Sequence, residues 1–185
     1  MPSNNFKKSK GGETKSGHAP NRGEEREYDQ VIIDIARVTR VMAGGKRMRF
    51  RACLVIGDKK GKVGSAVAKG ADVTLAVNKA LAKAKKNIVN VPIINETIPH
   101  RVKVKFGAAK ILLKPAPKGT GVIAGGAVRT VLDIAGVSNV VAKILGSKNK
   151  INNVKATITA LEKLKRVEPK LTKDNAAKPK KEKEA

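Results

Sequence analysis

Three arginines at alternate positions give the strongest chemical signal in the sequence. Arg47, Arg49 and Arg51 stand two residues apart, and the residues that alternate with them are Met48, Phe50 and Ala52. In a β-strand this spacing places the guanidinium groups on one face, about 6.6–6.8 Å apart, and the apolar side chains on the other face. Like charges in a row repel one another, and Asp and Glu are scarce nearby. We therefore expect this face to bind nucleic-acid phosphates; a plain solvent-exposed face is the alternative.

A second candidate is the glycine-rich segment GTGVIAGG at residues 119–126, which precedes an expected helix. Backbone N–H groups before a helix can bind an anion, and the helix dipole assists. The spacing is neither GxGxxG nor GxxxxGK[ST], which argues against a nucleotide-binding loop. Two readings stay open: an RNA phosphate at the start of the helix, or a tight turn that needs glycine for its geometry alone.

The remaining reactive side chains do not suggest catalysis. His100 has no second histidine near it for a metal site, and no nucleophile or pair of carboxylates lies beside it in the sequence, so we expect it to hydrogen-bond RNA or backbone. Cys53 is the single cysteine, which excludes an internal disulfide. It lies in an apolar run and is expected to be a small core residue. We expect no enzyme activity, no cofactor and no metal.

The composition points to a polyanionic partner. The chain has 185 residues with 40 Lys and Arg against 15 Asp and Glu, a formal net charge of +25. Residues 27–165 carry 27 of the basic and 8 of the acidic groups, so the excess lies on the part that folds. With Trp absent, one Tyr and three Phe, base stacking is limited, and contacts to phosphate and sugar are expected. No apolar run reaches the ~18 residues of a transmembrane helix, and we expect a cytoplasmic protein.

Hydrophobic periodicity predicts two small α+β blocks. The first contains a strand from about residue 31 with a bulge near Arg37, a Gly44–Gly45 turn, the arginine strand, a hairpin loop at 57–61, a strand at 62–69 and a helix at about 72–87 capped by Asp72. In the arginine strand we expect Met48, Phe50, Ala52, Leu54 and Ile56 to form the core face.

The second block is expected to run β-β-α-β-α. Strands are predicted at 101–105 and 109–114, a helix at about 125–135, a strand in the first half of 137–145, and a last helix capped by Asn152 or Asn153. The predicted division is a basic disordered arm at 1–27, a β-β-β-α domain at 28–92, a two-layer α/β domain at 93–166 and a basic disordered tail at 167–185. Each core is small, and small cores are marginal alone.

Several segments together resemble the bacterial small-subunit ribosomal S-five family. They are residues 37–69, KAKKNIVNV at 83–91, TIPH at 97–100, the segment 105–147 that contains PAPKGTGVIAGG, and NNVKATITALEKL at 152–164. The resemblance implies an amino-terminal domain like a double-stranded-RNA-binding domain and a carboxy-terminal domain with a left-handed crossover. SAVAKGAD at 65–72 is less glycine-rich than the family pattern, so the third strand is expected to pack differently.

The resemblance also implies partners and a role. They are small-subunit rRNA, the neighbouring proteins S-four and S-eight, and mRNA near the path by which it enters; the role is support of decoding accuracy. No homo-oligomer is expected. The loop with Gly44, Gly45 and Lys46 matches the family loop that approaches the spectinomycin site. The residues that we expect to bind RNA are Arg40, Gly44, Gly45, Lys46, Arg47, Arg49, Arg51, Lys62, Lys69, His100, Lys118, Gly119, Thr120, Gly121 and Arg129.

Two other functions compete with that of a structural rRNA-binding protein. A free double-stranded-RNA-binding regulator is compatible with the first domain alone, but the second domain and the basic ends argue against it. An enzyme that binds a nucleotide at the glycine-rich segment would need acidic residues for Mg²⁺ and a lysine in the P-loop position, and both are missing.

Overall fold

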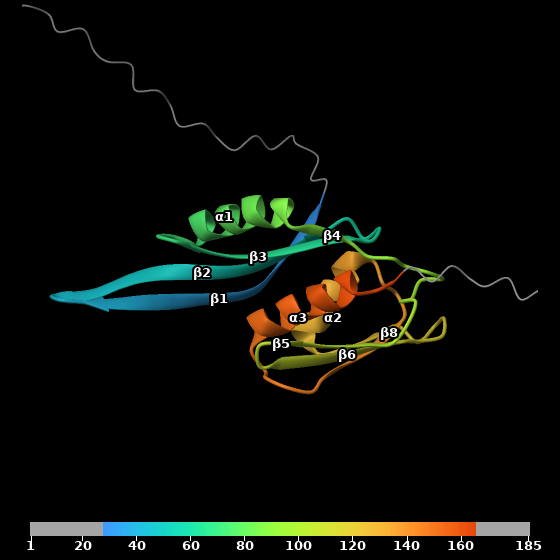
Figure 1. The fold of residues 1–185 in the computed structure, drawn as a ribbon. Coiled ribbons are helices and arrows are strands. Elements are labelled where there is room, and N and C mark those ends of the chain that lie inside the picture. Colours follow the sequence, from blue (N-terminus) through green and yellow to red (C-terminus); the bar gives the residue numbers. More distant parts are fainter. Residues whose placement is uncertain (1–27, 166–185) are drawn as a thin grey trace, which may run out of the picture.

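The structure, a computed structural model, describes residues 28–165, and the two basic ends predicted to be disordered lie outside these residues. Four layers stack in the order helix, sheet, helices, sheet, with α1 at the top of Figure 1 and β5, β6 and β8 at the bottom. The first half contains β1 (Asp29–Met42), β2 (Gly45–Gly57), β3 (Lys62–Gly70), α1 (Val73–Lys86) and β4 (Ile88–Asn90). The predicted β-β-β-α order and the α+β class are confirmed, and β4 is an addition.

The first sheet is antiparallel, with the strand order β1-β2-β3-β4. A two-residue turn at Ala43 and Gly44 joins β1 to β2 and pairs Met42 with Gly45. The turn lies one residue earlier than the predicted Gly44–Gly45 turn, because Gly45 already belongs to β2. Gly44 has φ +80°, the left-handed conformation that was predicted for it and that favours glycine. The predicted bulge near Arg37 was wrong, because the register shifts instead between Ile32 and Asp34.

Helix α1 approaches the sheet closely because the facing residues are small. Asp72 caps the helix as predicted, with its side chain accepting a hydrogen bond from the Val73 N–H at 2.7 Å. The buried stripe consists of Ala76, Ala80 and Ala84. A Cβ added to Gly64 of β3 would lie 2.8 Å from the Ala84 carbonyl oxygen, so this glycine permits the close approach.

The second half contains β5 (Val102–Phe106), β6 (Ala109–Pro115), β7 (Val122–Ile123), α2 (Gly126–Ala135), β8 (Val140–Ile144) and α3 (Lys150–Glu162). The strand order is β5-β6-β8-β7, and α2 links the parallel pair β7 and β8. Strand β7 is an addition to the predicted β-β-α-β-α order, and two boundaries differ from prediction. The strand lies in the second half of residues 137–145, and Asn149 rather than Asn152 or Asn153 caps α3, because Asn153 is 2% exposed and faces the core.

One sheet is buried on both faces where the two halves meet. Leu54 and Ile56 of β2 pack under α1, whereas Cys53 and Val55 belong to the core shared with α2, α3 and the second sheet. Alternation predicted only the first set, because it cannot reveal a second layer. Met48 was expected in the core but is 51% exposed, since this part of the hairpin extends beyond α1. Within residues 28–165 no helix is long and apolar enough to span a membrane.

Candidate nucleic-acid interface

The outer part of the β1–β2 hairpin carries a cationic hollow on the face of the sheet opposite α1. We call it the hairpin hollow. Its volume is about 280 Å³, and it is lined by Val38, Thr39, Arg40, Met42, Arg47, Arg49 and Lys69. The strand register explains the grouping, because Arg40 pairs with Arg47 and Val38 with Arg49. Directly paired residues lie on the same face of a sheet.

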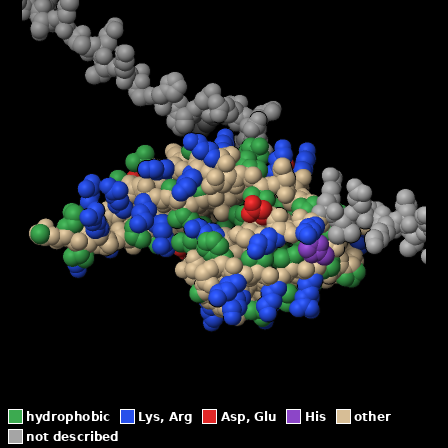
Figure 2. Space-filling view, viewed as in Figure 1, with side chains coloured by type: hydrophobic (Ala, Val, Ile, Leu, Met, Phe, Trp, Pro, Cys, Tyr) green, Lys and Arg blue, Asp and Glu red, His purple; other side chains and the backbone are tan. Residues whose placement is uncertain are grey.

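The four cations of the hairpin hollow have no acidic partner within residues 28–165. Arg40, Arg47, Arg49 and Lys69 are all exposed and form none of the ion pairs in this part of the chain. Guanidinium groups bind phosphate oxygens through a planar pair of N–H donors, and lysine supplies a point charge. An uncompensated group of this kind suits a phosphate backbone. In Figure 2, Lys and Arg side chains gather over the hairpin at the left.

Arg51 is set apart from the rest of the arginine row. Its Nη2 lies 3.7 Å from Asp34 Oδ2, and Asp34 Oδ1 lies 3.2 Å from Lys150 Nζ at the start of α3. The expectation of an unpaired, outward-facing row is therefore wrong for Arg51, whose side chain is 32% exposed. Arg51 and Asp34 instead connect the first sheet to the second domain. The sequence could not show this pairing, since Asp34 is 17 positions away in the chain.

The glycine-rich segment is held by a buried asparagine. Asn139 is 4% exposed, and its Oδ1 accepts hydrogen bonds from the backbone N–H groups of Gly119 (3.0 Å) and Gly121 (3.2 Å). These two N–H groups are therefore occupied within the turn. The reading of an RNA phosphate at the start of the helix concerns Gly125 and Gly126, where α2 begins, and it stays a prediction. Gly119 and Gly121 have left-handed φ values, +89° and +74°, which supports a turn that needs glycine for its geometry. Thr120 closes the turn through a hydrogen bond from its hydroxyl to the Pro117 carbonyl oxygen.

The other predicted residues are dispersed. Lys62 is exposed but lies at the opposite end of β3 from Lys69, and Lys118 is exposed beside the glycine-rich turn. Arg129 lies 3.6 Å from Asp133 one turn further along α2. The hairpin tip and the loop that follows β6 lie at opposite ends of the molecule in Figure 1. The structure therefore does not bring the hairpin residues and the glycine-rich turn into one site.

His100 makes the backbone contacts that were one of its two expected roles. Its Nδ1 lies 3.2 Å from the Arg101 carbonyl oxygen, and its Nε2 accepts a hydrogen bond from the Lys165 N–H at 3.2 Å. The ring thereby connects the segment before β5 to the segment that follows α3. Lys46, Gly44 and Gly45 lie exposed at the hairpin tip, next to the hairpin hollow.

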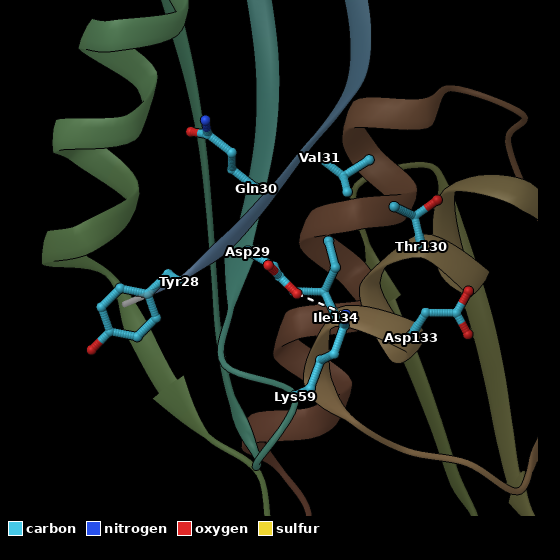
Figure 3. Close-up of a pocket in the computed structure, with 8 residues that line it drawn as sticks. All are labelled: Tyr28, Asp29, Gln30, Val31, Lys59, Thr130, Asp133 and Ile134. Carbon is cyan, nitrogen blue, oxygen red and sulfur yellow. Dashed lines mark ion pairs between the residues drawn. The ribbon is translucent and has the colours of Figure 1, made fainter. Parts of the chain in front are cut away.

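A second pocket, of about 400 Å³, lies between the start of β1, the loop at 57–61 and α2 (Figure 3). Asp29 and Lys59 form an ion pair across it at 2.7 Å, and Asp133 also lines it. Hydrogen bonding to Asp29 raises the pKa of Lys59. Two carboxylates make this pocket a poorer binding site for a polyanion than the hairpin hollow.

Sequence reasoning missed Val38, Thr39 and Met42 as lining residues and Asn139 as the residue that holds the glycine-rich turn. Val38 and Met42 follow from the register, which the two-residue turn at Ala43 and Gly44 fixes, because they share a face with Arg40. Thr39 pairs with Met48 on the other face, so the register does not predict it as a lining residue. Asn139 gives no signal in sequence, because its partners come from a separate loop.

Known proteins that are similar to this chain identify its family. The family models described as ribosomal protein S5, N-terminal domain, and ribosomal protein S5, C-terminal domain, match residues 28–92 and 104–175. The small ribosomal subunit protein uS5c of Spinacia oleracea is 51% identical over 139 residues, which are 75% of this chain and 45% of that protein. The protein of the same name from Rhodomonas salina is 51% identical over 142 residues, 76% of this chain and 84% of that protein. This chain thus spans less than half the length of the first relative and most of the second, and it belongs to the ribosomal protein S5 family.

Proposed function

We propose that the chain is a structural component of the small ribosomal subunit and binds small-subunit rRNA through the hairpin hollow. The observation that carries this proposal is the group of four exposed cations without an acidic partner among residues 28–165, arranged by strand register on one face of the hairpin. Family membership supports the same ligand, because both relatives are named as small ribosomal subunit proteins. The hollow is lined by side chains suited to phosphate and lacks aromatic rings, so binding depends on backbone shape.

The wider role follows from the family resemblance. Contacts with the proteins S-four and S-eight, proximity to the path of incoming mRNA and support of decoding accuracy are proposed on that ground. A bacterial origin is proposed on the same ground. The two-domain organisation supports a ribosomal component over a free RNA-binding regulator, and co-sedimentation of the full chain with small subunits separates these two functions.

The hairpin hollow is tested with a double variant, Arg47→Gln and Arg49→Gln. For each phosphate that the variant no longer neutralises, the slope of log affinity against log salt should flatten by ~0.9 on B-DNA scaling, and somewhat less on single strands. Circular dichroism should stay native, because both side chains are exposed. The matched control is Lys79→Gln with Lys83→Gln, which removes two charges from α1 on the other side of the sheet. If the arginine variant and the α1 control flatten the salt slope equally, the effect comes from net charge alone and the proposed site is contradicted.

A further inference from the structure

The outer face of the second sheet carries an array of lysines that the hairpin hollow does not explain. Helices α2 and α3 cover the inner face of this sheet, and its outer face lies at the lower edge of the molecule in Figure 1. Figure 2, in the same view, shows a row of Lys and Arg side chains along this edge. All five lysines of β5, β6 and β8 are exposed: Lys103, Lys105, Lys110, Lys114 and Lys143.

Strand register places these lysines on one face. Lys105 pairs directly with Lys110, and Leu112 pairs with Lys103 on one side and Lys143 on the other. The alternating residues Val104, Ile111 and Leu113 are buried on the inner face. With strands about 4.8 Å apart and alternate residues about 6.7 Å apart, the array covers about 10 Å by about 13 Å.

The array is electrostatically unfavourable in the isolated chain. Lys105 and Lys110 are a like-charged pair directly opposite each other, an arrangement that destabilises a sheet. Strands β5, β6 and β8 contain no Asp or Glu, and none of the five lysines forms an ion pair with another of residues 28–165. Binding of an extended polyanion would lower the repulsion between these lysines.

RNA fits this surface better than an acidic protein does. Lysine is depleted in the cores of protein–protein interfaces, whereas it is a usual ligand of nucleic-acid phosphates. The lysines are interspersed with half-buried Leu112 and Val141 and with exposed Ile123, and the face lacks aromatic rings and hydrogen-bonding groups that read bases. Contact with the phosphate backbone without sequence preference is the chemistry that such a face supports.

We propose that this lysine face is a second RNA-backbone surface, so that one chain joins two separate RNA segments. The hairpin hollow lies on an arm that extends beyond the second domain, whereas the lysine face lies on the outer layer of that domain (Figure 1). Two RNA segments can therefore occupy the two surfaces at once. The proposal rests on the proposed function for the nature of its ligand, but not for its location.

The test uses the full chain with Lys103, Lys105, Lys110 and Lys143 each changed to Gln. Binding to small-subunit rRNA is measured over a salt series for the parent, this variant, the Arg47→Gln, Arg49→Gln variant and their combination. The lysine variant should flatten the salt slope by ~0.9 for each phosphate left without its lysine, on B-DNA scaling, and the combination should flatten it by the sum of both. A variant with Arg at the same four positions should keep the parent slope.

Each outcome decides between the two sites. If the lysine variant keeps the salt slope of the parent and the hairpin variant has a flatter one, this inference is overturned and the proposed function stands. The reverse result overturns the hairpin hollow alone. If the combined variant flattens the salt slope no more than one variant does alone, the two surfaces form a single site and the bridging proposal is overturned. Normal RNA binding together with loss of a neighbouring subunit protein identifies a protein-binding face instead.

Bridging is tested directly, and folding is controlled. An immobilised rRNA fragment should retain a second, labelled fragment only when the parent chain is present, and either variant should abolish this retention. Because removal of Lys105 and Lys110 relieves repulsion, the lysine variant should melt no lower than the parent. If the fourfold variant does not fold, the pair Lys105→Gln and Lys110→Gln carries the test, and an unchanged salt slope for that pair overturns the inference.

Discussion

Replacement of Asn139 by alanine should loosen the glycine-rich turn and lower the stability of the whole chain. The substitution removes the acceptor for the N–H groups of Gly119 and Gly121, and also the 3.4 Å hydrogen bond from Asn139 Nδ2 to Glu96 Oε2. A neutral hydrogen bond contributes about 0.5–1.5 kcal/mol net, so the expected loss from the two bonds with the glycine N–H groups is about 1–3 kcal/mol. For a chain of this size, ~2 kcal/mol lowers Tm by about 4–8 °C.

The assay combines thermal melting with amide hydrogen exchange. In the parent, the Gly119 and Gly121 amides should be protected, and in the alanine variant both should exchange at the rate of an open loop. Ser138→Ala is the matched control, because Ser138 is exposed and precedes Asn139 directly; it should melt within about 0.5 kcal/mol of the parent. If the alanine variant keeps both the parental Tm and the protection of the two amides, Asn139 does not hold the turn.

A second substitution at the same position separates hydrogen bonding from charge. Asn139→Asp keeps the acceptor for both glycine N–H groups, but it replaces the donor to Glu96 with a second carboxylate. Two close carboxylates repel each other only while both are ionised. The loss of stability should therefore be largest near pH ~7 and should shrink as the pH falls toward ~4, where carboxylates become protonated. A deficit that grows with acidification would contradict this reasoning.

Single positions elsewhere in the chain give three further predictions. Gly136→Ala should be strongly destabilising in chemical denaturation, because φ is +84° and the added Cβ would lie 2.1 Å from the Lys59 carbonyl oxygen. Gly126 lies in open space at the start of α2, so Gly126→Ala should instead raise the free energy of unfolding by up to about 1 kcal/mol. Burial raises the pKa of the Cys53 thiol to about 11, with Asp34 adding to the effect, so a thiol reagent at pH ~8 should label it only as fast as the protein unfolds; rapid labelling of folded protein would refute this. Lys46→Gln at the hairpin tip should leave melting and subunit assembly unchanged but alter spectinomycin sensitivity, and an unaltered drug response would count against placing the tip at the drug site.

The prediction for Gly126 differs from what the glycine-rich sequence suggests. The reading of a tight turn that needs glycine did not say which glycines are needed, but the structure distinguishes among them. Gly121 has φ +74°, so a side chain there is strained, whereas Gly126 lies in open space with an ordinary φ. The sequence shows that glycines are present, and only the backbone shows which of them are needed.

Local sequence was sufficient where a feature depends on a few neighbouring residues. The cap at Asp72, the left-handed Gly44, the loop at 57–61 and the helix at about 125–135 were all predicted from spacing and residue type. The excess of positive charge likewise indicated a polyanionic ligand before any geometry was known. These features are set by interactions within a turn or a strand, so nearby residues specify them.

The tertiary structure decided every feature in which residues far apart in sequence meet. It buried both faces of β2 by packing the second domain against the sheet, and it removed Arg51 from the free arginine row through Asp34. It directed the Gly119 and Gly121 N–H groups to Asn139 and aligned five lysines from three strands on one face. Pairing of this kind depends on strand order and domain packing, which the spacing of residues along one strand does not encode.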